Sequence, residues 1–171
     1  VPSAHNKFYH LVTGVGPIQT AATLSCFLTE KHKEVSGIVN FGVGGAFCSA
    51  ISKGAEPQLL DLCVAEREVF GDLGVCLGDS VEYLPDDLVG TTVFELNNQL
   101  MQRSEARLIR DGIDYHKGVF VTVNSVSGLR RRGDFLQKKW NGLCENMEGA
   151  AVAYVSQLFS LELFEMRCIS N

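Results

Sequence analysis

The sequence lacks the cysteine and histidine spacings that are typical of metal-binding and disulfide-rich proteins. None of its six cysteines forms a CxxC pair, and its four histidines are not spaced for zinc. Most of the cysteines lie in apolar runs, where a cysteine behaves as a small hydrophobic residue. We therefore expect reduced thiols, a cytoplasmic protein, and no metal or other cofactor.

Long basic runs and long apolar runs are also missing. The formal net charge is −5, and the tightest cluster of positive charge, Arg130-Arg131-Arg132, is predicted to be a solvated loop. Nucleic acid is therefore not expected as the main partner. No apolar run is long enough to span a bilayer and no signal peptide is visible, so we expect no membrane association.

Two glycine-rich turns lack the residues that would make them known nucleotide-binding loops. Gly14-Val15-Gly16 would need a third glycine three residues later to complete the dinucleotide fingerprint, and that position is Gln19. Gly42-Val43-Gly44-Gly45 lacks the Lys-Ser/Thr pair of a P-loop. Each remains open as a simple tight turn or as a place where the backbone approaches a ligand.

What the sequence does contain is an alternation of apolar strands and helices. The 171 residues are 46% apolar, enough for one domain with a sizeable core. We predict an α/β protein with a central, mostly parallel or mixed sheet flanked by helices on both faces. We expect a single domain over residues 1–171 that is incomplete at both ends.

The expected elements follow from hydrophobic periodicity and turn residues. The helices are expected at Ile18–Lys31, Phe94–Arg110, Asp134–Trp140 and the small-residue stretch that begins near Gly149. The strands are expected at Tyr9–Thr13, Val35–Phe41, Leu59–Ala65, Gly118–Val126 and Leu163–Ile169, with a loop at Glu66–Gly74.

The most informative stretch is Glu145-Asn146-Met147-Glu148-Gly149-Ala150-Ala151, in which acidic and amide residues open a small, apolar helix. We expect Glu148 in the first turn. A carboxylate there could accept hydrogen bonds from the two hydroxyls of a ribose and stabilise positive charge on a sugar ring. Alternatively, it is an acid that only favours the helix dipole.

Asn171 follows the last predicted strand directly. An amide both donates and accepts hydrogen bonds, so Asn171 could contact a ring nitrogen and a neighbouring oxo group of a purine. An ordinary turn residue is the alternative.

Taken together, these segments resemble the nucleoside phosphorylase/nucleosidase superfamily, with a three-layer fold. The resemblance covers nearly the whole chain, through Thr13–Gly16, Asn40–Gly45, Val121–Asn124, Glu145–Ala151 and Arg167–Asn171. Within the superfamily, the chain looks most like the futalosine hydrolases of menaquinone biosynthesis. The segments that suggest this are Phe70–Gly74, Thr122–Gly128 and the motif Glu-Asn-Met-Glu-Gly-Ala-Ala.

The resemblance implies roles for individual residues. Glu148 matches the acid that binds the ribose hydroxyls, and Asn171 matches the position of a catalytic Asp in methylthioadenosine nucleosidases. An Asn fits a 6-oxopurine such as hypoxanthine better than adenine, but it is not a general acid. The resemblance also assigns substrate contacts to Gly44, Gly45, Asn124, Asn146 and Met147. Val126 occupies the place of a base-stacking Phe, so Phe47 is a candidate to supply that stacking.

The resemblance predicts an N-ribosyl hydrolase that releases hypoxanthine from futalosine, acting on a small nucleoside as a homodimer or larger homo-oligomer. Phosphorylases of the superfamily often carry an Arg where this chain has Asn40, which favours water as the nucleophile. The acid that orients this water in the hydrolases follows an N-terminal strand that lies outside this sequence. Alternatives are a methylthioadenosine/S-adenosylhomocysteine nucleosidase, a purine nucleoside phosphorylase, or an inactive nucleoside-binding module.

Overall fold

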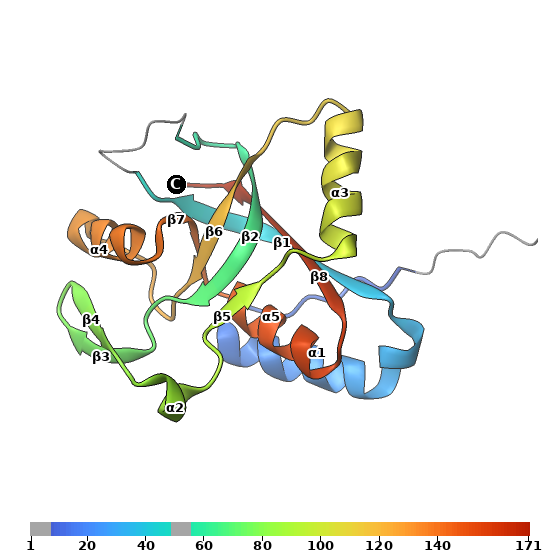
Figure 1. Ribbon diagram of the computed structural model, residues 1–171, viewed down its shortest axis with the longest axis horizontal. Coiled ribbons are helices and arrows are strands. Elements are labelled where there is room, and N and C mark those ends of the chain that lie inside the picture. Colours follow the sequence, from blue (N-terminus) through green and yellow to red (C-terminus); the bar gives the residue numbers. More distant parts are fainter. Residues whose placement is uncertain (1–7, 49–55) are drawn as a thin grey trace, which may run out of the picture.

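A computed structural model describes residues 8–48 and 56–171, and Figure 1 shows its path. The expected domain also includes residues 1–7 and 49–55, which lie outside the described residues. The helical elements are α1 (Pro17–Lys31), η1 (His32–Glu34), α2 (Asp86–Val89), α3 (Gln99–Arg110), α4 (Arg130–Trp140) and α5 (Gly149–Leu158). The strands are β1 (Gly37–Ala46), β2 (Leu62–Phe70), β3 (Gly74–Leu77), β4 (Ser80–Tyr83), β5 (Val93–Glu95), β6 (His116–Thr122), β7 (Gly142–Asn146) and β8 (Glu162–Ile169).

The main sheet is mixed, and it closes on itself. Its six strands run in the order β5-β2-β6-β7-β1-β8, and β8 returns to pair with β2. The pairs β1–β8, β2–β6 and β6–β7 are parallel, whereas β1–β7, β2–β8 and β2–β5 are antiparallel. The prediction of an α/β fold with a mixed central sheet and flanking helices is therefore confirmed.

The helices cover this sheet from several sides (Figure 1). α5 packs on the sheet and α1 packs on α5, while α3 lies against β8 and α4 against β7. The larger apolar core joins α1 and α5 to the sheet through Leu28, Phe120 and Phe164. A smaller core, which includes Val121 and Leu136, lies beneath α4.

Several predicted boundaries are wrong, each for a local reason. Tyr9–Thr13 forms no strand; the ring of Tyr9 instead packs edge-on against Phe27 of α1. The predicted loop at Glu66–Gly74 begins as the second half of β2, because a bulge near Glu66 lets that strand continue to Phe70. The predicted helix from Phe94 begins only at Gln99, since Val93–Glu95 pairs with β2 as strand β5.

Two further differences affect the site. Glu145 and Asn146 lie on β7 rather than at the opening of a helix, and Glu148 is the N-cap of α5 rather than a first-turn residue. The three arginines from Arg130 belong to α4 rather than to a loop. In the described part of the chain, none of the helices has the length and apolar character needed to cross a bilayer.

Candidate functional site

The glycine turn before α1 binds an anion, but the anion is part of the protein. The N–H group of Gly16 donates to Oε1 of Glu148 over 3.0 Å. Gly16 has φ 86°, a left-handed conformation that favours glycine. This turn, which the sequence left open as a tight turn or a ligand contact, therefore holds the carboxylate of Glu148 at the N-terminus of α1.

Glu148 is held from a second side by a buried arginine. Its Oε2 lies 3.6 Å from Nη2 of Arg167, and its side chain is 18% exposed, against 3% for that of Arg167. A carboxylate fixed by one N–H group and one guanidinium, yet still partly open to solvent, retains free lone pairs for hydroxyl groups of a ligand.

Asn146 fixes the backbone that carries Glu148. Its Oδ1 accepts hydrogen bonds from the N–H groups of Glu148 (2.9 Å) and Gly149 (2.7 Å), and its Nδ2 donates to Glu68 (2.6 Å). The next free N–H of the helix, at Ala150, donates to the hydroxyl of Thr122. Asn146 is only 3% exposed and supports the backbone behind Glu148, while its substrate contact stays a prediction.

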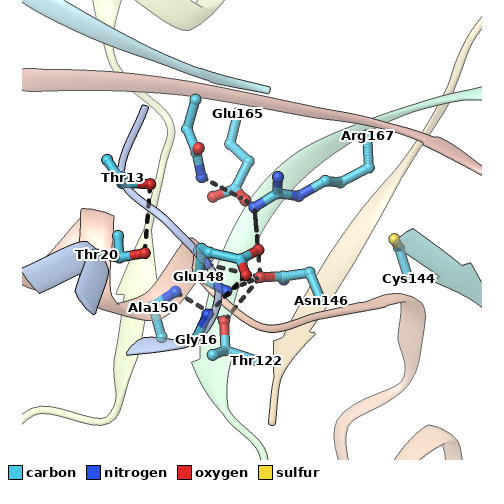
Figure 2. Close-up of polar contacts among 12 residues, drawn as sticks. Thr13, Gly16, Thr20, Thr122, Cys144, Asn146, Glu148, Ala150, Glu165 and Arg167 are labelled. Carbon is cyan, nitrogen blue, oxygen red and sulfur yellow. Dashed lines mark hydrogen bonds and ion pairs between the residues drawn. The ribbon is translucent and has the colours of Figure 1, made fainter. Parts of the chain in front are cut away.

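Two buried carboxylates complete this network, and Figure 2 shows its part around Glu148, Glu165 and Arg167. Glu68 on β2 and Glu165 on β8 are both 0% exposed. Glu165 pairs with Arg167 at 3.0 Å and accepts a hydrogen bond from Asn40 at 2.9 Å. Arg167 is thus shared between Glu165 and Glu148.

Burial controls the charge of these two acids. It raises the pKa of Glu68 well above its usual range, with Glu165 adding a repulsive charge. Burial also raises the pKa of Glu165 to about 7, although the positive charge of Arg167 opposes this rise. Burial therefore favours the neutral form of Glu68, and the guanidinium of Arg167 lies within ion-pair distance of both Glu148 and Glu165.

A cavity of about 250 Å³ lies where the ends of β7 and β8 meet β1. Gly45 pairs with Glu145 of β7, and the preceding Gly44 pairs with Ile169 of β8. Residues that line the cavity include Gly45, Phe47, Ser127, Glu145 and Asn171. The structure thus brings Asn171, Gly45 and Phe47 together beside strand β7, which leads into the turn that carries Glu148.

The glycine run Gly42–Gly45, predicted as a turn, lies within strand β1, and Gly44 and Gly45 are needed for this close approach. A Cβ atom on Gly45 would lie 3.1 Å from the amide nitrogen of Asn171, and one on Gly44 would lie 2.9 Å from the carbonyl oxygen of Glu145. The carbonyl of Asn171 accepts a hydrogen bond from the N–H of Ala46 at 2.9 Å. This backbone bond places the Asn171 amide at the cavity.

The remaining predicted residues are not gathered at the same place. Asn124 donates through its backbone and its amide to the two carboxylate oxygens of Asp72, at 2.9 and 3.0 Å. Val126 is 60% exposed, and neither it nor Asn124 is among the described residues that line the cavity. Met147 is half-buried between Asn146 and Glu148.

Comparison with known proteins identifies the family. A model of the phosphorylase superfamily matches residues 6–171 of the chain. The chain belongs to the phosphorylase superfamily. Among curated superfamily members, the futalosine hydrolase of Thermus thermophilus is 27% identical over 164 residues, covering 96% of this chain and 69% of that protein. The futalosine hydrolase of Streptomyces coelicolor is 30% identical over 166 residues, covering 94% and 66%.

Solved structures of the superfamily share the fold. The native structure of futalosine hydrolase from Helicobacter pylori matches with a TM-score of 0.76 at 21% identity, and the match covers 93% of this chain and 66% of that one. A mutant of the 5′-methylthioadenosine/S-adenosylhomocysteine nucleosidase (MTAN) of the same organism, with 5′-methylthioadenosine in the active site, has a TM-score of 0.75 at 22% identity. This match covers 93% of this chain and 64% of that one. The chain spans about two thirds of the length of the relatives that it matches.

Sequence reasoning missed four charged residues of the site: Glu68, Glu145, Glu165 and Arg167. Glu165 and Arg167 alternate with apolar residues on β8, so a strand pattern does place them on one face. Glu68 was missed because Glu66–Gly74 was predicted to be a loop. Among the described residues, no group of three or more His, Cys, Asp or Glu side chains is arranged to hold a metal ion.

Proposed function

We propose that the protein is an N-ribosyl hydrolase that cleaves the glycosidic bond of futalosine and releases hypoxanthine. The observation that carries this proposal is the carboxylate of Glu148, held by Gly16 and Arg167 while still 18% exposed. The superfamily membership and the three curated relatives, all futalosine hydrolases, support the same substrate.

In this proposal Glu148 acts on the ribose. Its free lone pairs accept hydrogen bonds from the sugar hydroxyls, and its negative charge stabilises the positive charge that develops as the glycosidic bond lengthens. Gly16 and Arg167 hold the carboxylate in place before the substrate arrives, so little reorganisation is needed at the moment of reaction. The partial burial of the site strengthens this electrostatic effect.

Water completes the reaction. A bond forms between the water oxygen and the anomeric carbon, and the attacking water gives up one proton. The electron pair of the broken C–N bond passes to the purine, which takes up one proton. Asn171 can hydrogen-bond to the leaving base but cannot supply that proton, because an amide is not an acid in this pH range.

Asn40 supports water over phosphate as the nucleophile. Its amide donates to Glu165, inside the carboxylate network, and carries no charge that could bind phosphate. We therefore expect the full-length protein to release hypoxanthine from futalosine at a rate independent of added phosphate. Chromatography of the products with and without phosphate measures this. A sugar 1-phosphate product, with a rate that rises with phosphate, would contradict hydrolysis.

The same assay separates the other candidates. Turnover of methylthioadenosine but not of futalosine would favour the methylthioadenosine nucleosidase alternative, which the fold shared with MTAN keeps open. Binding of nucleosides without turnover of any would favour an inactive binding module. A cytoplasmic homodimer or larger homo-oligomer remains part of the proposal, and light scattering of the purified protein tests its oligomeric state.

A further inference from the structure

Glu145 is the buried acid that the proposed reaction leaves without a role. It lies on β7 next to Asn146 in sequence, and neighbouring residues of a strand point to opposite faces of the sheet. The side chain of Asn146 joins the network around Glu148, whereas Glu145 lines the cavity that also contains Asn171. Glu145 is only 7% exposed.

The carboxylate of Glu145 is held in a fixed orientation by Ser127. The backbone N–H of Ser127 donates to Oε2 over 2.8 Å, and its hydroxyl donates to Oε1 over 2.7 Å. Each carboxylate oxygen can accept a second hydrogen bond. No salt bridge to Glu145 is formed within residues 8–48 and 56–171. A buried carboxylate without a cation favours further N–H donors at its remaining lone pairs.

The cavity has the dimensions of a site for a single small ring system. Its volume of about 250 Å³ is below the range of roughly 300–1,000 Å³ that is typical of pockets for drug-sized ligands. It offers the acceptor of Glu145, the amide of Asn171, which both donates and accepts, and the largely apolar wall of Phe47. A flat heterocycle with an N–H donor beside an oxo acceptor matches this set.

We propose that Glu145 is a specificity-determining residue that accepts the ring N–H of a 6-oxopurine, with Ser127 as its positioning residue. Asn171 then donates from its amide to the neighbouring oxo group. This inference rests on the proposed function, because it assumes that the ligand is a purine nucleoside. It adds Glu145 as the residue that gives the site its preference for a 6-oxopurine over a 6-aminopurine.

The discrimination between hypoxanthine and adenine follows from whether the ring nitrogen next to the oxo or amino group carries a hydrogen. In hypoxanthine, the ring nitrogen beside the oxo group carries a hydrogen and donates to a carboxylate. In adenine, the corresponding nitrogen carries a lone pair, which a carboxylate repels, and the oxo acceptor is replaced by an amino donor. A buried group that loses its hydrogen-bond partner is costly, so such sites reject the wrong analogue strongly.

The test measures binding of the free bases, which requires no turnover. Hypoxanthine and adenine are titrated by calorimetry into the full-length wild type and into Glu145→Gln, Ser127→Ala and Asp134→Asn. Asp134 is a matched control, because it lies at the same cavity but its side chain is 54% exposed and pairs with Arg130. Thermal unfolding of each variant reports whether it is folded.

We expect the wild type to prefer hypoxanthine, and Glu145→Gln to reduce the ratio of hypoxanthine to adenine affinity by about 10- to 100-fold. Ser127→Ala should reduce the ratio less, about 3- to 10-fold, since the carboxylate remains but loses one of its two donors. Asp134→Asn should leave the ratio unchanged. If Glu145→Gln does not fold, the reduced ratio in Ser127→Ala is the decisive measurement.

Two outcomes would overturn the proposal. One is a wild type that does not prefer hypoxanthine. The other is a ratio unchanged in the folded variants, with both bases weakened equally, which would assign Glu145 a purely structural role in holding the loop of Ser127. The result is independent of the proposed reaction: a wild type that cleaves no nucleoside but shows the expected ratios would contradict the hydrolase and leave the base site intact.

Discussion

At the scale of single residues, the site is a set of carboxylates whose surroundings give them different properties. Glu148 is partly open and paired with Arg167, Glu165 is fully buried beside the same arginine, and Glu68 is fully buried with hydroxyl and amide donors. Because charge is costly to bury, the acid that is open to solvent is the one available to a substrate as an anion.

Replacing Glu148 tests this assignment. We expect Glu148→Ala to reduce kcat/KM for futalosine by 100-fold or more, since the loss of charge stabilisation of this kind costs about 3 kcal/mol in the transition state. The fold should survive, as judged by circular dichroism and thermal unfolding. Glu66→Ala, which removes an exposed acid from β2, is the control and should remain fully active. Near wild-type turnover of Glu148→Ala would remove Glu148 from the reaction.

A second prediction at this scale concerns Asn171. Aspartate can accept hydrogen bonds and can protonate a ring nitrogen, but it cannot donate from an amide. We therefore expect Asn171→Asp to lower the ratio of kcat/KM for futalosine to that for its adenine counterpart at least tenfold. An unchanged ratio, in a variant with wild-type stability, would mean that Asn171 does not contact the base.

At the scale of elements, the turn from β7 into α5 determines where Glu148 lies. Gly149 packs directly on the two buried acids, and the small residues that follow it are buried against the sheet. The first N–H groups of α5 are satisfied by Asn146 and Thr122 from β7 and β6, in place of a side-chain cap from the helix itself. The start of the helix is therefore fixed by neighbouring strands.

This packing predicts an asymmetric response to two glycine substitutions. In Gly149→Ala, the new Cβ would collide with Oε1 of Glu68 and lie 2.6 Å from Oε1 of Glu165. We expect a loss of unfolding free energy at the upper end of the 1–3 kcal/mol that is typical of overpacking, together with reduced turnover. In Gly133→Ala, inside α4, the nearest side-chain atoms are 3.9 Å away, so a gain of about 0.5–1 kcal/mol is expected. Urea unfolding of both variants tests the contrast, and equal effects would contradict it.

At the scale of the whole molecule, the charged network lies inside a sheet that closes. Glu68 comes from β2, Asn40 from β1, and Glu165 and Arg167 from β8, and the β2–β8 pairing brings these strands together. The network is therefore coupled to global folding, because unfolding separates these strands and exposes the acids to water.

The raised pKa of Glu165 predicts how stability depends on pH. Its folded value is about 7, against 4.5 as the ordinary value, so between these pH values the folded state binds more protons than the unfolded state. The unfolding free energy should therefore fall as pH rises from 5 to 8, by on the order of 3 kcal/mol from Glu165, with Glu68 acting in the same direction. Acids with lowered pKa, such as Asp61, lose their contribution only below about pH 4 and lie outside this window.

Urea unfolding at pH 5, 6, 7 and 8 measures this dependence. Glu165→Gln keeps the shape of the side chain but removes the titrating group, so its profile should be flatter than that of the wild type. Parallel profiles of the two proteins would show that Glu165 does not titrate in this range.

How much of this structure was predictable depends on how local each feature is. The α/β class, the helix at Pro17–Lys31, the first half of strand β1 and the small-residue helix α5 follow from periodicity and composition within short windows. Glu148 stood out for the same reason, as an acid at the opening of an apolar helix. These features depend on neighbours in the chain, so the sequence by itself determined them.

The tertiary structure alone decided which charges are buried and what they contact. Several contacts join residues that are far apart in the chain: Gly16 lies 132 residues from Glu148, Asn40 lies 125 residues from Glu165, and Glu68 lies 78 residues from Asn146. Whether a charged residue in a strand faces water or the interior depends on the partners that the closed sheet supplies, because an unpaired buried charge is too costly. The place of Glu145 at the cavity likewise depends on tertiary structure, because it follows from the pairing of β7 with β1.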